Sequence, residues 1–195
     1  MKEEQPTTRV FIVHGWGDKP GDHWMPWLKE QLELKGFTVA APAMPRTEAP
    51  AIGAWISHLR REVGETGEAA YYVGHSIGCQ TIMRHLEQLP ASGTARGATF
   101  VAPWFVLTNL TAEEEPIAQP WIDTSIDFAR VRSRLPELTA YFSDDDPYVS
   151  LDNQSLFEQR LGARTHLLKG LKHMGVESGM TTFAELLATT LKALG

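Results

Sequence analysis

AYYVGHSIG, at residues 70–78, is the stretch of the sequence that decides the fold. It contains the pattern G-x-S-x-G between a short apolar run and an amphipathic stretch that is typical of a helix. This context indicates a sharp strand-to-helix turn that exposes a serine hydroxyl at the edge of a parallel sheet. A side chain at Gly74 or Gly78 would collide with the neighbouring strand and helix, which explains both glycines.

The same turn predicts where a reaction could take place. Ser76 is the candidate nucleophile, and the backbone N–H of Ile77 is a candidate hydrogen-bond donor to an oxyanion because it would lie at the start of the helix. The pattern alone also arises by chance, so the alternative is a glycine-rich turn with an incidental serine. The apolar strand before Ser76 and the helix pattern after it favour the nucleophile.

Short apolar runs alternate with amphipathic stretches along the whole chain, which is typical of a parallel sheet with helices on both faces. Several runs are apolar throughout, as expected for strands that are covered on both sides. We therefore predict one domain over residues 1–195, built on a mostly parallel sheet of about six strands. The predicted strands are Arg9–Val13, Phe37–Ala41, Ala70–Val73, Ala98–Ala102, Leu138–Phe142 and Thr165–Leu168.

Five stretches between these runs have helical patterns. The first is expected to begin after Asp22 as N-cap and to end at Gly36. The others are residues 51–63, the stretch from just after Ser76 to before Pro90, the stretch from Ser150 to Gly162, and residues 182–194. In the last helix the core-facing residues are expected to be Phe183, Leu186, Leu187, Leu191 and Leu194.

The segment Pro103–Pro136 has no clear pattern and contains three consecutive glutamates, residues 113–115. We expect a solvated loop with short helices, and a partial lid over the site is the alternative.

A serine nucleophile needs a base and an orienting carboxylate. In this kind of sheet the chain order is serine, then aspartate or glutamate, then histidine. Asp146 directly follows the fifth predicted strand and His173 directly follows the sixth, so both would lie at the edge where a parallel sheet collects its functional loops. Asp145 and Asp144 compete with Asp146, which we favour because Pro147 follows it.

Six further histidines are less suited to the role of base. His166 would lie in a strand, and His58 and His85 would lie on solvated helix faces. His75 is next to Ser76 but is expected to point away from it, and the last two histidines, His14 and His23, flank the first loop.

The first loop begins His14-Gly15-Trp16-Gly17. The corresponding loop of such sheets supplies a second oxyanion donor, for which we select the backbone N–H of Trp16. The Trp16 side chain would either cover the core or form one wall of a substrate pocket. A dinucleotide site is disfavoured because the glycines are spaced one residue too far apart, and no acidic residue follows the second strand to hold a ribose.

These motifs together resemble the small serine hydrolases similar to retinoblastoma-binding protein nine, which occur in bacteria and animals. The resemblance covers essentially the whole chain and implies a compact α/β-hydrolase fold without a large cap domain. It also implies the catalytic residues Ser76, Asp146 and His173. The motifs that carry it are His23-Trp24, Gly74-His75-Ser76, Asp145-Asp146-Pro147-Tyr148 and Gly170-Leu171-Lys172-His173.

Composition excludes several other classes of protein. The net charge of −6 argues against a broad surface for nucleic acid or anionic lipid. Cys79 is the only cysteine, so an internal disulfide and a cysteine metal cluster are excluded, and a reducing, cytoplasmic location is expected. No apolar run is long enough to span a membrane, and the start MKEEQPTTR lacks the features of a signal peptide.

We therefore predict a hydrolase that cleaves a small ester or amide through an acyl-enzyme intermediate, with no metal and no cofactor. Tryptophans 16, 104 and 121 are candidates for an apolar pocket, although core positions are commoner for tryptophan. The alternative is a low-turnover binding protein on a hydrolase fold. The oligomeric state is not readable from the sequence.

Overall fold

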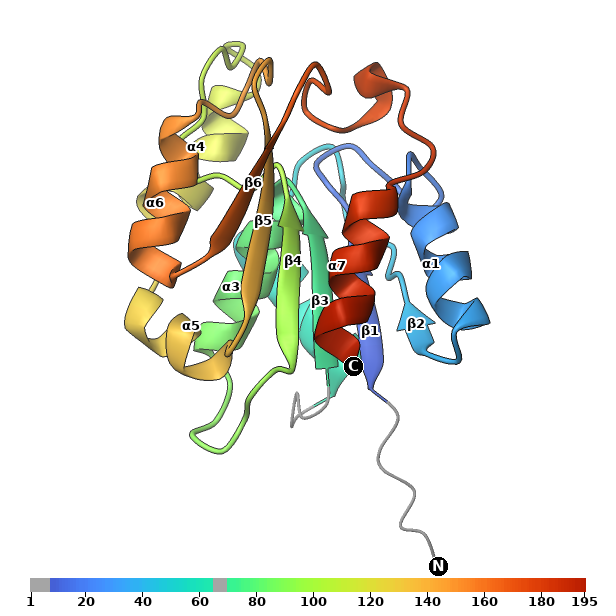
Figure 1. The fold of residues 1–195 in the computed structure, drawn as a ribbon. Coiled ribbons are helices and arrows are strands. Elements are labelled where there is room, and N and C mark those ends of the chain that lie inside the picture. Colours follow the sequence, from blue (N-terminus) through green and yellow to red (C-terminus); the bar gives the residue numbers. More distant parts are fainter. Residues whose placement is uncertain (1–7, 65–69) are drawn as a thin grey trace, which may run out of the picture.

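The computed structural model describes residues 8–64 and 70–195, and its centre is a six-stranded parallel sheet (Figure 1). The strand order is β2-β1-β3-β4-β5-β6. This arrangement confirms the predicted α/β fold class. Residues 1–7, where a signal peptide was not expected, lie outside the described residues. The strands are β1 (Arg9–Val13), β2 (Thr38–Ala40), β3 (Ala70–His75), β4 (Gly97–Val101), β5 (Leu138–Ser143) and β6 (Arg164–Leu168).

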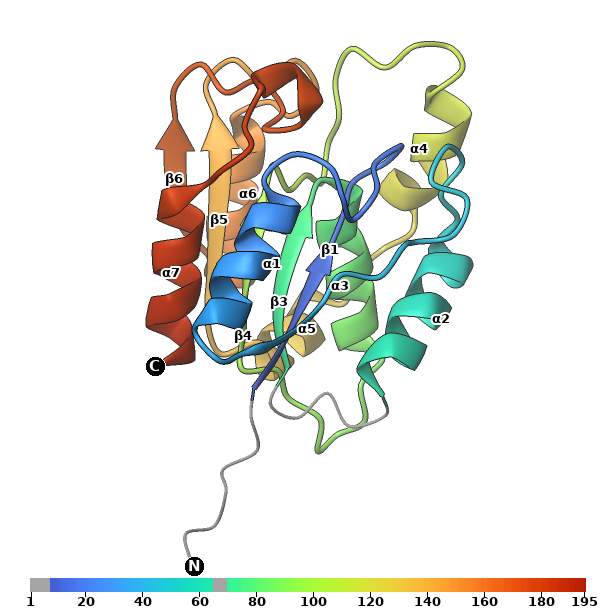
Figure 2. The ribbon, with the colours of Figure 1, turned by 90° about the vertical axis from the view of Figure 1, so that its right-hand side faces the viewer.

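Helices cover both faces of the sheet, because successive side chains of each strand point to opposite faces. In β1, Val10 and Ile12 pack toward α1 and α7, whereas Phe11 and Val13 face the cluster beneath α2 and α3 (Figure 2). The helices are α1 (Met25–Leu34), α2 (Ile52–Val63), α3 (Ile77–Glu87), α4 (Glu115–Asp123), α5 (Phe128–Arg134), α6 (Asp152–Leu161) and α7 (Ala184–Leu194), with a short 3₁₀ helix η1 (Val176–Ser178).

The start of α1 differs from the prediction. The helix begins at Met25, with Trp24 rather than Asp22 in the cap position. Pro26 fits the first turn because its missing N–H would have no partner there. The Asp22 carboxylate instead accepts the backbone N–H of Lys19 at 2.8 Å. The end of α1 is as predicted, since Gly36 adopts a left-handed conformation with φ +89°.

The segment Pro103–Pro136 is only partly the solvated loop that was expected. It contains α4 and α5, but its side chains Trp104, Trp121 and Val131 are buried in the main core cluster. The Arg84 guanidinium of α3 donates to the carbonyl oxygens of Trp121 and Thr124 at 2.8 and 2.7 Å, at the C-terminal end of α4. The segment is therefore anchored to the core.

Helix α3 is almost completely buried, and this corrects the prediction for His85. That side chain is 1% exposed instead of solvated, and burial together with the Arg60 charge lowers its pKa to about 4. His58 is half-buried on α2. His166 lies on β6 as expected, exposed and stacked on Tyr141 at a ring distance of 5.0 Å.

The order of the strands determines where the functional loops meet. The chain crosses from β1 to β2 at one edge, then returns to place β3 on the other side of β1. A crevice forms at such a reversal, outside the carboxyl ends of the strands. The loops after β1, β3, β5 and β6 all reach this end of the sheet, at the top of Figure 1. In the described part of the chain, no helix could cross a lipid bilayer.

Candidate active site

Ser76 lies in the turn between β3 and α3, with its backbone at φ 51° and ψ −119°. A non-glycine residue rarely adopts this conformation, which costs about 1–3 kcal/mol and persists only where neighbouring contacts enforce it. Here the Ser76 N–H donates to the carbonyl of Val101 at 2.9 Å, and its own carbonyl accepts the N–H of Cys79 at 3.0 Å. The turn therefore holds the hydroxyl above the end of the sheet.

The two glycines of the motif are required by close contacts with the backbone. A Cβ atom at Gly74 would lie 2.9 Å from the backbone nitrogen of Cys79 in α3. A Cβ atom at Gly78 would lie 2.7 Å from the carbonyl oxygen of His14, and even closer to that of Val13. The steric explanation drawn from the sequence is thus confirmed at both positions.

His173 lies between Ser76 and Asp146. Its Nε2 is 2.8 Å from the Ser76 hydroxyl oxygen, and its Nδ1 is 2.8 Å from Oδ2 of Asp146. The other Asp146 oxygen accepts two backbone N–H groups, of Tyr148 and Val149, so the carboxylate, which is 2% exposed, is fixed from both sides. A proton on Nδ1 leaves Nε2 free to accept the serine proton.

The three consecutive aspartates all hold the loop that follows β6. Oδ1 of Asp144 accepts the N–H of Gly170 at 2.9 Å, and Oδ1 of Asp145 accepts the N–H of Lys172 at 2.8 Å. Hydrogen bonds from Lys172, then Ser143, lower the pKa of Asp145 to about 2. Of the three aspartates, only Asp146 has a side-chain hydrogen bond to the His173 ring.

The backbone around His173 is strained and tightly held. Its neighbours Lys172 and Met174 have φ values of 51° and 54°. The His173 N–H donates to the Glu177 carboxylate at 3.1 Å, and the Met174 carbonyl accepts the indole N–H of Trp24 at 3.1 Å. These contacts fix the position of the imidazole before any substrate binds.

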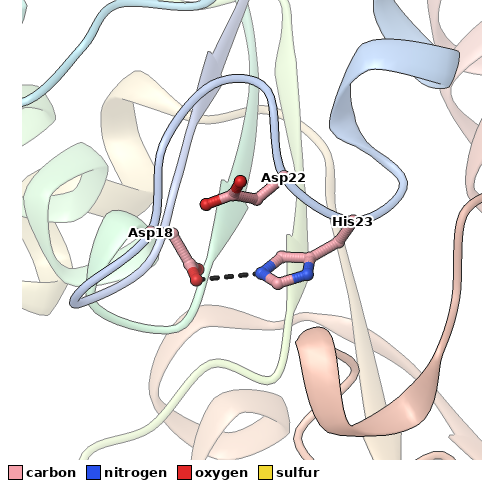
Figure 3. Close-up of side chains that lie close together, drawn as sticks. All are labelled: Asp18, Asp22 and His23. Carbon is pink, nitrogen blue, oxygen red and sulfur yellow. Dashed lines mark hydrogen bonds and ion pairs between the residues drawn. The ribbon is translucent and has the colours of Figure 1, made fainter.

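A second hydrogen-bonded chain lies behind His173, and the sequence analysis missed it. His75 has no hydrogen bond to the Ser76 side chain; its Nε2 donates to the His173 carbonyl at 2.9 Å. The Nδ1 of His75 lies 3.1 Å from the Asp18 carboxylate. This carboxylate also accepts a hydrogen bond from the N–H of Gly15 and one from Nε2 of His23, which lies 2.8 Å away (Figure 3). Burial alone would raise the pKa of Asp18, but the hydrogen bonds from His23 and His75 lower it below its usual range.

Asp18, Asp22 and His23 also have the composition of a metal site, and their ligand atoms lie within 4.8 Å of one another. The hydrogen bonds of Asp18 to His23 and of Asp22 to Lys19 account for this cluster without an ion. We therefore describe it as a network that connects the first loop to His173. Its signal in the sequence was His23, which flanks that loop and belongs to the His23-Trp24 motif.

In the first loop, one backbone N–H is left without an acceptor among the described residues. The N–H of Gly15 donates to Asp18, and that of Gly17 donates to the carbonyl of Thr47 at 2.9 Å. Between them, the N–H of Trp16 has no acceptor among residues 8–64 and 70–195, and neither has that of Ile77 at the start of α3. Both N–H groups are therefore available to an external oxygen.

A cleft of about 380 Å³ opens beside Ser76 and His173. Trp16, Trp104 and Tyr148 contribute aromatic surface to it. Trp121 does not line this cleft but is a core residue, with its indole N–H donating to the carbonyl of Pro50 at 2.9 Å. The remaining apolar lining comes from Ile77, Leu107, Leu110 and Val176, and the carboxylates come from Asp18, Glu48, Glu114 and Glu177.

Comparison with known proteins gives matches over most of the chain. The family model described as serine hydrolase matches residues 10–191. The chain is 26% identical over 179 residues to a Bacillus subtilis protein named "Putative hydrolase YdeN", covering 90% of both chains. The crystal structure of the ydeN gene product from B. subtilis has a TM-score of 0.87 and 23% identity, and the match covers 96% of this chain and 98% of that one. Est1E from Butyrivibrio proteoclasticus matches with a TM-score of 0.71 and 11% identity, over 96% of this chain and 88% of that one.

Proposed function

The chain belongs to the serine hydrolase family, and from this premise we propose that it cleaves small carboxylic esters, with amides as a second substrate class, through a triad of Ser76, His173 and Asp146. The observation that carries the proposal is the pair of 2.8 Å contacts through which His173 joins the serine hydroxyl to the aspartate. Three groups from three different loops meet in the order that acyl transfer requires.

In the proposed reaction, Nε2 of His173 takes the proton from the Ser76 hydroxyl as the oxygen attacks the substrate carbonyl. The negative charge that develops on the carbonyl oxygen is stabilised by the N–H groups of Ile77 and Trp16. His173 then gives its proton to the leaving group, and Asp146 stabilises the imidazolium in between. A water molecule, activated by the same histidine, releases the acyl group and regenerates the serine.

The finer assignments from the sequence belong to the same proposal. We infer that the chain acts as one domain over residues 1–195, in the cytoplasm, and needs neither a metal nor a cofactor for this chemistry. The similarity to retinoblastoma-binding protein nine stays a prediction about the subgroup of the family. Carboxylesterase activity is supported by the open cleft beside Ser76.

The proposal predicts that a fluorophosphonate probe labels the folded protein at Ser76 and that Ser76→Ala removes nearly all hydrolysis of activated esters. Loss of one member of a triad lowers kcat by up to about a million-fold. Ser155→Ala is a matched control, because Ser155 is exposed on α6, outside the site. Mass spectrometry of the labelled peptide and initial rates of ester hydrolysis are the measurements.

Two results would contradict this proposal. Retention of more than a few per cent of the activity by purified Ser76→Ala would exclude the mechanism. Absence of labelling in folded protein would favour the alternative, a binding protein with little turnover.

A further inference from the structure

The cleft beside Ser76 carries negative charge from several separate segments. Glu48 comes from the loop after β2, Glu114 from the segment before α4, and Glu177 from η1 after β6. Among the described residues that line the cleft there is no lysine and no arginine. Three distant parts of the chain thus each bring one carboxylate to the same opening.

These three carboxylates are not neutralised by cations. In the described part of the chain, none of them forms an ion pair. Glu114 accepts hydrogen bonds from the backbone and hydroxyl of Thr111, and Glu177 accepts the N–H of His173. Lys172, the cation next to His173, is paired with Asp145 at 2.8 Å.

The aromatic walls of the cleft favour the same sign of charge in a ligand. Trp16, Trp104 and Tyr148 lie among the lining residues. A cation over the face of an aromatic ring is attracted by the ring quadrupole, and quaternary ammonium ligands are commonly bound in this way. Trp16 and Tyr148 are partly exposed and can offer a ring to such a cation, whereas an anion would meet the carboxylates. The overall charge of −6 acts in the same direction at longer range.

We propose that the cleft selects esters that carry a positive charge, on an amine or a quaternary ammonium group, within a few bonds of the ester, and that it disfavours anionic esters. The inference rests on the proposed function, since it concerns the substrates of the same serine. It depends on the lining of the cleft, whereas the catalytic assignment depends on the contacts of His173, so the two can fail separately.

Three thioesters that release a thiol test the charge preference. Acetylthiocholine is the cationic substrate, 3,3-dimethylbutyl thioacetate is its neutral counterpart of the same shape, and 2-sulfoethyl thioacetate is the anionic one. Each kcat/KM is divided by the rate of alkaline hydrolysis of the same compound, which removes differences in intrinsic reactivity. We expect the cationic ester to exceed the neutral one by about ten-fold, which corresponds to ~1.4 kcal/mol, and the anionic ester to be the poorest.

The carboxylates are tested with the double variant Glu48→Gln/Glu114→Gln. The ratio of cationic to neutral kcat/KM should fall by about three- to five-fold in this variant. Glu113→Gln is the matched control, because Glu113 is exposed next to Glu114 but does not line the cleft, and its ratio should equal that of the wild type. Raising the salt concentration toward 1 M, where charges are screened beyond about 3 Å, should lower the wild-type ratio.

Three outcomes decide whether the cleft prefers cationic esters. A ratio of one or less in the wild type, or an unchanged ratio in the double variant, would overturn the charge preference while leaving Ser76-dependent hydrolysis intact. If none of the thioesters is hydrolysed, activated esters and probe labelling still decide the proposed function, and binding to Ser76→Ala decides the charge preference. Acetylthiocholine must then bind more tightly than 3,3-dimethylbutyl thioacetate by calorimetry, and equal or weaker binding would overturn the inference.

Discussion

The backbone is strained both at the nucleophile, Ser76, and beside its base, His173. The φ of Ser76 is positive, and so are those of Lys172 and Met174, the two neighbours of His173. Such conformations are stable only where surrounding contacts enforce them, and they concentrate at functional sites. Here the enforcing contacts are the backbone pairing of Ser76 with Val101 and the aspartates of the loop after β5. The nucleophile and its base are therefore positioned by the fold rather than by the substrate.

The three aspartates should differ strongly in their effect on catalysis. We expect Asp146→Asn to lower kcat by about ten-thousand-fold, because an amide would favour the wrong imidazole tautomer. Asp145→Asn should lower it by only about ten-fold, since Asp145 acts through the backbone of Lys172. Asp144→Asn should have the smallest effect. Steady-state rates of the three variants on one activated ester provide the comparison, and equal losses in Asp145→Asn and Asp146→Asn would contradict the assignment.

The sequence indicated residues 144–146 for the carboxylate and favoured Asp146 only through the proline that follows it. Residues 144–146 follow the same strand, and a rotation of one residue would present a different side chain to His173. The choice depends on the loop after β6, which pairs with each aspartate in turn. The network around His75 was not predicted for a related reason, because its partner Asp18 is 57 positions away in the sequence.

Among the helices, α3 is central to the organisation of the site. It begins at the nucleophile, and near its other end Arg84 is 1% exposed and donates to carbonyl oxygens at the end of α4. The amphipathic pattern of α3 predicted a solvated face for this region. That prediction was wrong for His85, since α2 and α5 pack against α3 and cover it, and the pattern of α3 alone does not show this cover.

Replacement of Arg84 should loosen α4 and affect the site indirectly. Arg84→Met leaves the carbonyls of Trp121 and Thr124 without donors, and we expect a loss of about 2 kcal/mol in the free energy of unfolding. Glu114 and Leu110 of the cleft precede α4, so KM should rise more than kcat falls. Urea unfolding and Michaelis kinetics test this, with the exposed Arg132→Met on α5 as the control. Equal stability of the two variants would show that Arg84 does not anchor α4.

For the molecule as a whole, the buried His85 predicts a loss of stability in mild acid. Its pKa is about 4 in the folded protein against an ordinary value of 6.5, so between these values the unfolded chain binds a proton that the folded chain does not. The free energy of unfolding therefore rises with pH across this window, and about 3 kcal/mol of it is lost as the pH falls from 6.5 to 4. When the free energy of unfolding is measured with urea from pH 4 to 7, it should rise less steeply with pH for His85→Gln than for the wild type.

The difference between the wild type and His85→Gln isolates the contribution of His85 to the pH dependence of stability, because all other groups titrate in both proteins. His23, whose pKa is raised from 6.5 by its hydrogen bond to Asp18, loses its contribution to stability only as the pH rises above that value, and it cancels in the difference. Parallel pH profiles for the wild type and His85→Gln would contradict the prediction.

The size of the cleft sets an upper limit on the acyl chain. A volume of about 380 Å³, open to solvent, encloses a short acyl group but not a long one. Each methylene that is fully buried adds about 0.8 kcal/mol, and this gain stops where the chain emerges into water. We expect kcat/KM to be flat or to fall beyond about six carbons. An ester series from acetate to palmitate with one leaving group tests this, and a steep rise toward palmitate would require an apolar tunnel under Pro103–Pro136.

The pairing of residues 144–146 with the loop after β6 has a consequence for how such a chain can change in length. Loops are usually where proteins accept insertions and deletions. Here one added or missing residue in either loop would shift three hydrogen bonds at once and separate Asp146 from His173. We therefore expect natural and laboratory-evolved length variants to tolerate additions at the opposite end of the sheet, such as the exposed turn at Ala91 and Ser92 between α3 and β4, while the loops after β5 and β6 keep their lengths.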